Sequence, residues 1–149
     1  MLNVRVVLKY IDRYRRRDDW QMHEQNLAIV KGLVCVAWAD GKIASEEAEL
    51  LESLLQAFHA TPSEAHEIRL FARQPRGLDD VPLTDLAAED RRVLLHYAVL
   101  ITFVDRVQSS SEKDFLSRLA ARLRLPPDDS ERIVSAAELQ AQTLVHLLD

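Results

Sequence analysis

Acidic residues flank a sharp turn near residue 40 at a spacing that is typical of calcium-binding loops. Asp40, Gly41 and Glu47 fit the fifth, sixth and twelfth positions of an EF-hand loop, where carboxylate oxygens surround a turn that glycine enters easily. The same register places Val36 and Trp38 at the first and third positions, and neither side chain can hold a cation. The segment is therefore not an EF-hand, although it retains half of a set of oxygen ligands.

The second half of the chain repeats this arrangement 65 positions later. When residues 28–68 are laid on residues 93–133, both acids of the first turn meet acids of the same type, and the apolar stripe and the next helix start also coincide. The pattern predicts two helix–turn–helix units that pack face to face around a pseudo-twofold axis. If the turns meet, their carboxylates form a site for calcium or magnesium, which prefer oxygen ligands. The predicted metal ligands are Asp40, Glu47, Asp105 and Glu112.

Ordinary helix capping explains the same residues without a metal. Asp40-Gly41 is also a helix-ending turn, because glycine adopts the left-handed conformation at little cost. Ser109 and Glu112 have the spacing of a capping box, in which the glutamate accepts a backbone hydrogen bond. Two alternatives therefore stay open: a divalent-cation site, or acids that serve only as caps and salt bridges.

Apolar residues recur at spacings of three and four nearly everywhere, and no alternating pattern of useful length predicts a strand. The fold class is therefore all-α, a bundle of roughly seven helices in one domain that spans residues 1–149. Thr61 to Glu64 form a capping box with proline in the first turn, which marks one helix start. Residues 74–82, rich in proline and glycine, form the clearest connection. Predicted helices cover residues 1–17, 20–39, 45–58, 62–72, 84–104 and 127–148.

Charge is distributed unevenly along the chain. The net charge is −5, yet residues 1–17 hold six basic residues and one acid. Apolar positions fall on one face of this segment, so we expect a basic amphipathic helix that docks on the core or contacts anionic lipid. The acidic remainder offers no extended basic surface, so nucleic acid is not an expected partner.

The cysteine count and the apolar runs indicate the compartment. Cys35 is the only cysteine, which rules out an intramolecular disulfide and a zinc site made of several thiolates, and we expect Cys35 to lie in the core. No run reaches the roughly 20 apolar residues that cross a bilayer, and the first residues do not resemble a secretory leader. We expect a cytoplasmic protein, peripheral at the inner membrane face if its N-terminal helix binds lipid.

Motifs of common catalytic sites are missing from the sequence. No histidine has a glutamate three positions before it, as carboxylate-bridged di-iron bundles require. Zincin, phosphate-loop and nucleophile-elbow patterns are also absent. We therefore expect a protein that is not an enzyme.

The first acidic turn resembles the signature of TerB-like proteins, a family named for bacterial tellurite resistance whose fold also occurs in membrane-anchored DnaJ-type co-chaperones. The match rests on Ala39-Asp40-Gly41, Ile43 and Ser45-Glu46-Glu47, and it continues more weakly over residues 93–133. The resemblance implies a pseudo-symmetric helical bundle, metal-ligand roles for the four acids, and a stress-response function as a sensor or adaptor with an unknown protein partner.

The second copy departs from the family pattern at three positions. Arg106 replaces the turn glycine, Gln108 replaces the hydrophobic residue, and Lys113 follows Glu112. Arg106 and Lys113 could neutralise the acids without a metal. The alternative function is therefore a metal-free helical module that binds a protein partner and uses its acids as helix caps.

Overall fold

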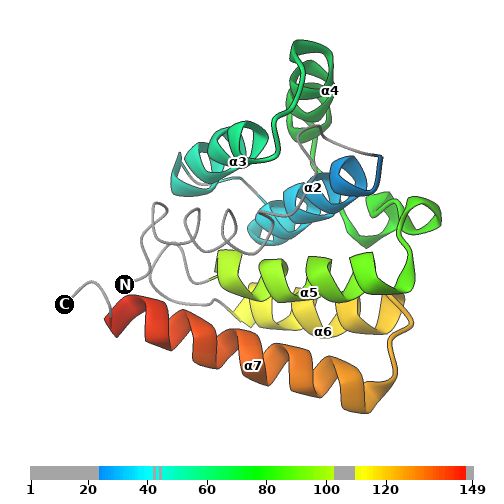
Figure 1. Ribbon diagram of the computed structural model, residues 1–149, viewed down its shortest axis with the longest axis vertical. Helices are drawn as coiled ribbons and strands as arrows, with labels where there is room; N and C mark the ends of the chain where they lie inside the picture. The colour runs from blue at the N-terminus through cyan, green and yellow to red at the C-terminus, as the bar shows by residue number, and fades with distance from the viewer. Residues whose placement is uncertain (1–23, 42, 44, 103–109, 147–149) are drawn as a thin grey trace.

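The computed structural model describes residues 24–41, 43, 45–102 and 110–146, and the regular structure within these ranges is entirely helical. The α-helices form two layers, one above the other in the view of Figure 1. The first layer contains α2 (Glu24–Ala37), α3 (Ser45–Ala57) and α4 (Pro62–Ala72). The second contains α5 (Ala88–Thr102), α6 (Ser110–Arg122) and α7 (Pro127–His146). The remaining short 3-10 helices are η1 (Trp38–Asp40), η2 (Leu78–Asp80) and η3 (Leu83–Asp85).

This architecture confirms the predicted all-α fold class. Six α-helices lie within the described ranges, and the predicted basic helix over residues 1–17 lies outside them. Its docking on the core or on lipid therefore stays a prediction. No helix in the described ranges is long and apolar enough to span a membrane.

The two layers meet where α2 packs against α5. Every residue from Leu94 to Thr102 is buried except His96, and a helix that is apolar on nearly all sides belongs in the interior. Gly32 lies at the crossing, because a Cβ atom there would come within 2.7 Å of the Leu94 Cδ2 atom. Cys35 lies in this core as predicted, and burial raises the pKa of its thiol to about 12. The thiol is therefore protonated and unreactive in the folded protein.

The side chain of Arg91 joins the connection between the layers to the end of α6. Its guanidinium donates hydrogen bonds to the backbone oxygens of Leu83 at 2.9 Å, Leu86 at 3.1 Å and Leu123 at 3.1 Å. The Leu83 oxygen also accepts a hydrogen bond from the Leu86 N–H at 3.2 Å. The guanidinium carries five N–H donors, so one side chain can contact three separate carbonyl groups.

Three predicted helix starts are confirmed and one is wrong. α3 begins at Ser45, α4 begins at Pro62 behind the capping box, and α7 begins at Pro127. The helix predicted over residues 84–104 begins four residues later, at Ala88. Leu86 is buried with an extended backbone, and the Asp90 carboxylate accepts a hydrogen bond from the Ala87 N–H at 3.0 Å. Burial and capping together outweigh the helical pattern before Ala88.

The two layers share several features 65 positions apart. α3 and α6 both contain 13 residues, and their first and last residues correspond under this shift. Each helix is followed by a non-glycine residue in the left-handed region, His59 (φ 55°) and Arg124 (φ 57°). Because the predicted repeat also includes residues outside the described ranges, the pseudo-twofold repeat as a whole stays a prediction.

Candidate functional site

The first acidic turn closes at Gly41. Its backbone has φ = 83°, and its N–H donates to the Trp38 oxygen at 2.8 Å. A side chain at this position would strain the backbone, so the turn itself requires glycine. Trp38 fixes the other side of the turn, because its indole N–H donates to the Ala72 oxygen at the end of α4 at 3.1 Å. The backbone position of Asp40 is therefore set by contacts on both sides, although its side chain lies outside the description.

Glu47 and Glu112 are buried, with exposed fractions of 3% and 2%. Each is the third residue of its helix, α3 and α6 respectively, where the helix dipole stabilises a carboxylate. Both residues have interaction partners in the folded protein. A buried carboxylate is costly unless hydrogen bonds or cations compensate it. Their matched burial identifies these two predicted ligands as interior groups rather than surface charges.

Other helix starts show what an ordinary capping carboxylate looks like in this protein. Glu64 accepts from the Thr61 N–H at 2.8 Å, and Asp80 accepts from the Gly77 N–H at 2.9 Å. Glu64, Asp80 and the Asp90 described above are half-buried or exposed. Glu47 and Glu112 occupy the same helix position but differ in burial, so capping alone does not explain where they lie.

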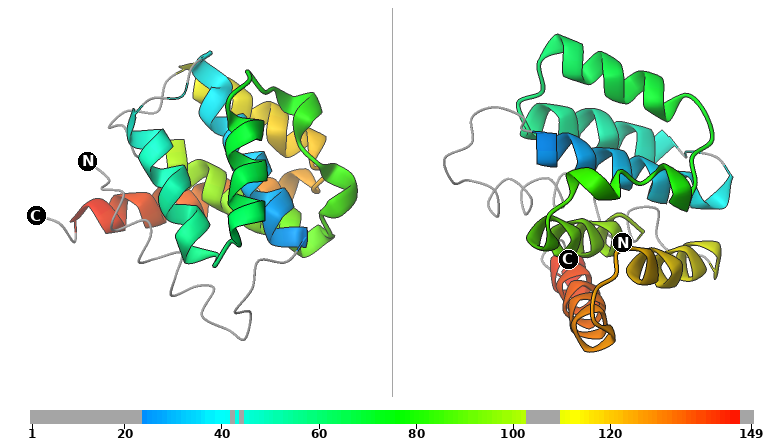
Figure 2. Two further views of the ribbon diagram at one scale, coloured as in Figure 1. Left: turned by 90° about the horizontal axis from the view of Figure 1, so that it is seen from above. Right: turned by 90° about the vertical axis from the view of Figure 1, so that its right-hand side faces the viewer.

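The first turn and the second layer lie next to each other. η1 packs against α6, and both views of Figure 2 show the end of α2 and η1 beside the beginning of α6. Asp40 and Glu112 therefore belong to neighbouring segments. Asp105 lies outside the described ranges, so its position relative to these acids stays a prediction. Among the described residues, no group of three or more His, Cys, Asp or Glu side chains is placed to hold a metal.

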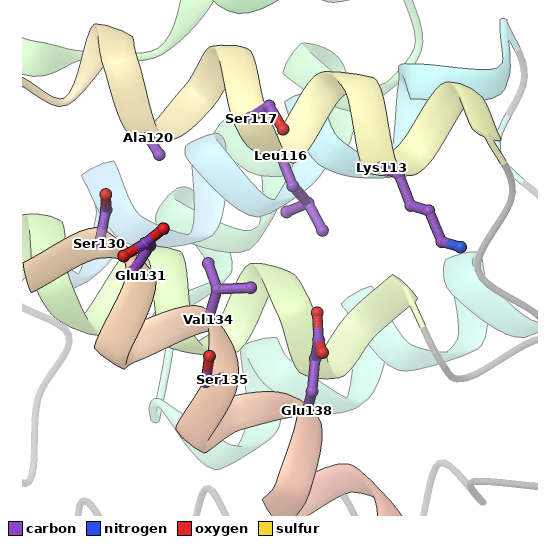
Figure 3. A pocket seen from close by; sticks show the side chains of 9 residues that line it. All are labelled: Lys113, Leu116, Ser117, Ala120, Ser130, Glu131, Val134, Ser135 and Glu138. Carbon is purple, nitrogen blue, oxygen red and sulfur yellow. The ribbon is translucent and has the colours of Figure 1, made fainter. Parts of the chain in front are cut away.

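Lys113 and Glu112 are adjacent in the sequence but differ in burial. Glu112 is buried, whereas Lys113 is exposed and lines an open groove between α6 and α7 (Figure 3). We call this the α6–α7 groove; it has a volume of about 420 Å³. The residues that define it here are Lys113, Leu116 and Ser117 from α6 and Glu131, Val134 and Glu138 from α7. Sequence periodicity showed the apolar faces of the helices but not the space between them.

A smaller cleft of about 200 Å³ lies between α5 and α7. Burial lowers the pKa of His96 in its wall, so the imidazole is neutral at pH 7. Arg92, also in the wall, pairs with Asp129 at 3.2 Å, and Asp129 binds Arg132 as well. Hydrogen bonds from Arg92 and then from Arg132 lower the pKa of the Asp129 carboxyl. Arg92, Asp129 and Arg132 are therefore paired with one another.

Comparison with known proteins corrects the family expected from the acidic turn. The model of the family described as "Protein of unknown function (DUF533)" matches residues 12–137, which is most of the chain. No curated protein and no solved structure matches the chain. The predicted membership of the TerB-like family is therefore wrong, because the match over this range is to a different family. The chain belongs to the DUF533 family of proteins of unknown function.

Proposed function

We propose that this chain is a non-catalytic, cytoplasmic helical protein that binds a divalent cation through its two acidic turns and acts as a sensor or adaptor. The matched burial of Glu47 and Glu112 is the observation that supports the proposal most directly. These residues lie 65 positions apart in helices of equal length. The proposal includes the predicted pseudo-twofold repeat, which makes the two half-sites equivalent.

The donor set fits a hard cation. Asp40, Glu47, Asp105 and Glu112 would supply only carboxylate oxygens, which calcium and magnesium prefer over softer ligands. The cation would balance negative charge that burial makes costly. η1 ends at Asp40 and packs beside the helix that carries Glu112, which supports a site shared between the layers.

A second candidate is a metal-free module that binds a protein partner. The carboxylates of Glu64, Asp80 and Asp90 all accept hydrogen bonds from the backbone N–H three positions earlier, without a cation. If Glu47 and Glu112 do the same in a buried setting, the acidic turns are purely structural.

Thermal unfolding in the presence of metal ions distinguishes the two candidates. Calcium, magnesium, manganese and zinc are titrated separately to millimolar concentration against a chelator control. An ion that binds the folded state alone adds about 2.7 kcal/mol at 100 times its dissociation constant, a rise of roughly 5–10 °C in Tm. If none of the four ions raises Tm, the cation-binding proposal is wrong.

Paired substitutions test whether the effect belongs to the proposed ligands. Asp40→Asn with Glu112→Gln should abolish the metal-dependent rise in Tm. Glu49→Gln with Asp114→Asn removes the same charge from exposed positions of α3 and α6 and should leave the rise intact. Equal losses in both double variants would indicate nonspecific attraction to an acidic protein.

A further inference from the structure

The α6–α7 groove lies between two consecutive helices that both pack against a third helix, α5. α6 and α7 each pack against α5, and Figure 3 shows the side chains of both helices facing the space between them. Leu116 and Val134 provide an apolar floor, with exposed and half-buried polar residues along the edges. The lining positions recur at spacings of three and four on both helices, so the groove follows the helices for about two turns.

The corresponding pair of helices in the first layer is bridged at this place. Arg69 of α4 and Glu52 of α3 form a bidentate ion pair, with nitrogen–oxygen distances of 2.8, 3.0 and 3.2 Å. Under the shift of 65 positions, Glu52 corresponds to Ser117 and Arg69 to Val134. Both substituted residues line the α6–α7 groove. The second layer therefore has a serine and a valine where the first has a bridge between its helices.

The charges of the groove indicate what kind of partner it accepts. Both ionisable residues that α7 contributes, Glu131 and Glu138, are acidic and lie seven positions apart on the same side of the helix. The α6 edge contributes one ionisable residue, Lys113, so the acidic charge of the groove is on its α7 edge. Within the described part of the chain, neither forms an ion pair, whereas Asp129 on the same helix is paired with two arginines. Seven residues are close to two helical turns, so a second helix with basic residues at the same interval can face both glutamates.

We propose that the α6–α7 groove binds an amphipathic helix of a partner protein, with an apolar stripe on Leu116 and Val134 and basic residues opposite Glu131 and Glu138. An amphipathic helix that places its apolar face in a groove between helices is a common mode of recognition. A small molecule fits less well, because small-molecule sites use a few convergent polar groups, whereas here two glutamates lie along the α7 edge and Lys113 lies on the α6 edge. This inference goes beyond the proposed cation site and uses different residues.

The test transfers the bridge of the first layer to the second. In the bridged variant, Ser117→Glu with Val134→Arg places an ion pair across the groove. The matched control, Ser111→Glu with Ala136→Arg, adds the same charges at exposed positions of α6 and α7 that do not line the groove. A separate charge-reversal variant, Glu131→Lys with Glu138→Lys, changes the edge of the groove without filling it. Melting curves establish that each variant is folded.

The probe is a phage-displayed library of amphipathic helices about 15 residues long, with a fixed leucine stripe and randomised polar positions. Peptides selected on the wild-type protein are synthesised, and their affinities are measured by fluorescence anisotropy. We expect selected peptides to carry lysine or arginine two turns apart and to bind wild type and control equally. The bridged variant and the charge-reversal variant should each weaken binding by at least about tenfold.

Three results would overturn the proposal. The library could yield no binder, the selected peptides could lack the basic pair, or they could bind the bridged and charge-reversal variants as tightly as wild type. Sedimentation equilibrium of the protein alone supplies a further criterion. If the wild-type protein is a dimer and the bridged variant is a monomer, the groove is occupied by a second copy of this chain rather than by a partner protein.

Discussion

The α3–α4 pair and the α6–α7 pair have matching helix starts but different side-chain bridges. α3 and α6 correspond residue for residue at both ends, and α4 and α7 both begin at a proline, Pro62 and Pro127. α4 is tied to α3 by the Arg69–Glu52 pair, to α2 by Lys31–Glu67 at 3.4 Å, and to η1 by Trp38. α7 is tied instead to α5, through Arg92 and Asp129.

This difference indicates that backbone geometry and surface contacts vary independently in this protein. The buried positions that set the helix packing, such as Leu54 and Leu119, correspond in both layers and are fully buried. The bridges lie on the outside, where a substitution costs little stability. One layer can therefore close the space between its outer helices while the other leaves a groove, without any change in the core.

Among the substitutions proposed here, replacing Arg91 should lower the free energy of unfolding most. Its counterpart in the first layer is Asn26, which is too short to reach three separate carbonyl groups. Arg91→Leu would leave the oxygens of Leu83, Leu86 and Leu123 without this donor, so we expect a loss of about 3 kcal/mol in the free energy of unfolding, measured in urea.

The control for this prediction is Arg118→Leu. Arg118 is exposed on α6 and pairs only loosely with Asp114, at 3.8 Å, so its loss should change stability little. If Arg91→Leu and Arg118→Leu lower the urea midpoint equally, the carbonyl contacts do not hold the connection to α6.

Trp38→Phe should lower the free energy of unfolding by an intermediate amount. It also gives the first layer the residue type found at the corresponding position of the second. The residue that corresponds to Trp38 is Phe103, whose side chain has no N–H to donate. Phenylalanine retains most of the apolar contact but leaves the Ala72 oxygen without the indole donor. We expect a loss of about 1.5 kcal/mol, again from urea unfolding. A variant as stable as wild type would mean that solvent replaces the indole at the end of α4.

The sequence predicted correctly the helix starts that are marked by neighbouring residues, such as a capping box or a proline in the first turn. The Thr61–Glu64 capping box and Pro127 mark their helices without help from tertiary contacts. The start of α5 was mispredicted because the burial of Leu86 depends on packing between layers. The contacts of Arg91 and the width of the α6–α7 groove join segments far apart in the chain, so no local pattern reveals them.

The sequence singled out two acids that the structure buries, while the site itself stays a proposal. The repeat identified Glu47 and Glu112 as equivalent acids, and their burial is a property that only the structure supplies. The expected family was wrong because Asp-Gly followed by helix-opening glutamates reflects general turn and capping chemistry. Such residues suit any chain that ends one helix and begins another within a few positions.

The smallest change in Tm is expected when the Arg69–Glu52 ion pair of the first layer is removed. Glu52→Ser with Arg69→Val replaces the ion pair with the residues found at the corresponding positions of the second layer. Both side chains are about half exposed, and solvent screens such pairs. We therefore expect Tm to fall by about 2 °C or less. The purpose of this variant is to open the space between α3 and α4, which a selected helical peptide could then occupy.

The pH dependence of this small difference tests its cause. The hydrogen bond from Arg69, with its positive charge, lowers the pKa of the Glu52 carboxyl below its ordinary value of 4.5. Because the folded-state pKa is the lower one, the pair stabilises the fold fully above about pH 4.5, and its contribution is lost as pH falls through the folded-state pKa. The difference in Tm between wild type and the double variant should therefore be constant near pH 7 and vanish in acid. Titration of His96 is common to both proteins and cancels in the comparison, so a difference that persists at pH 3 would indicate that lost packing, and not lost charge pairing, destabilises the variant.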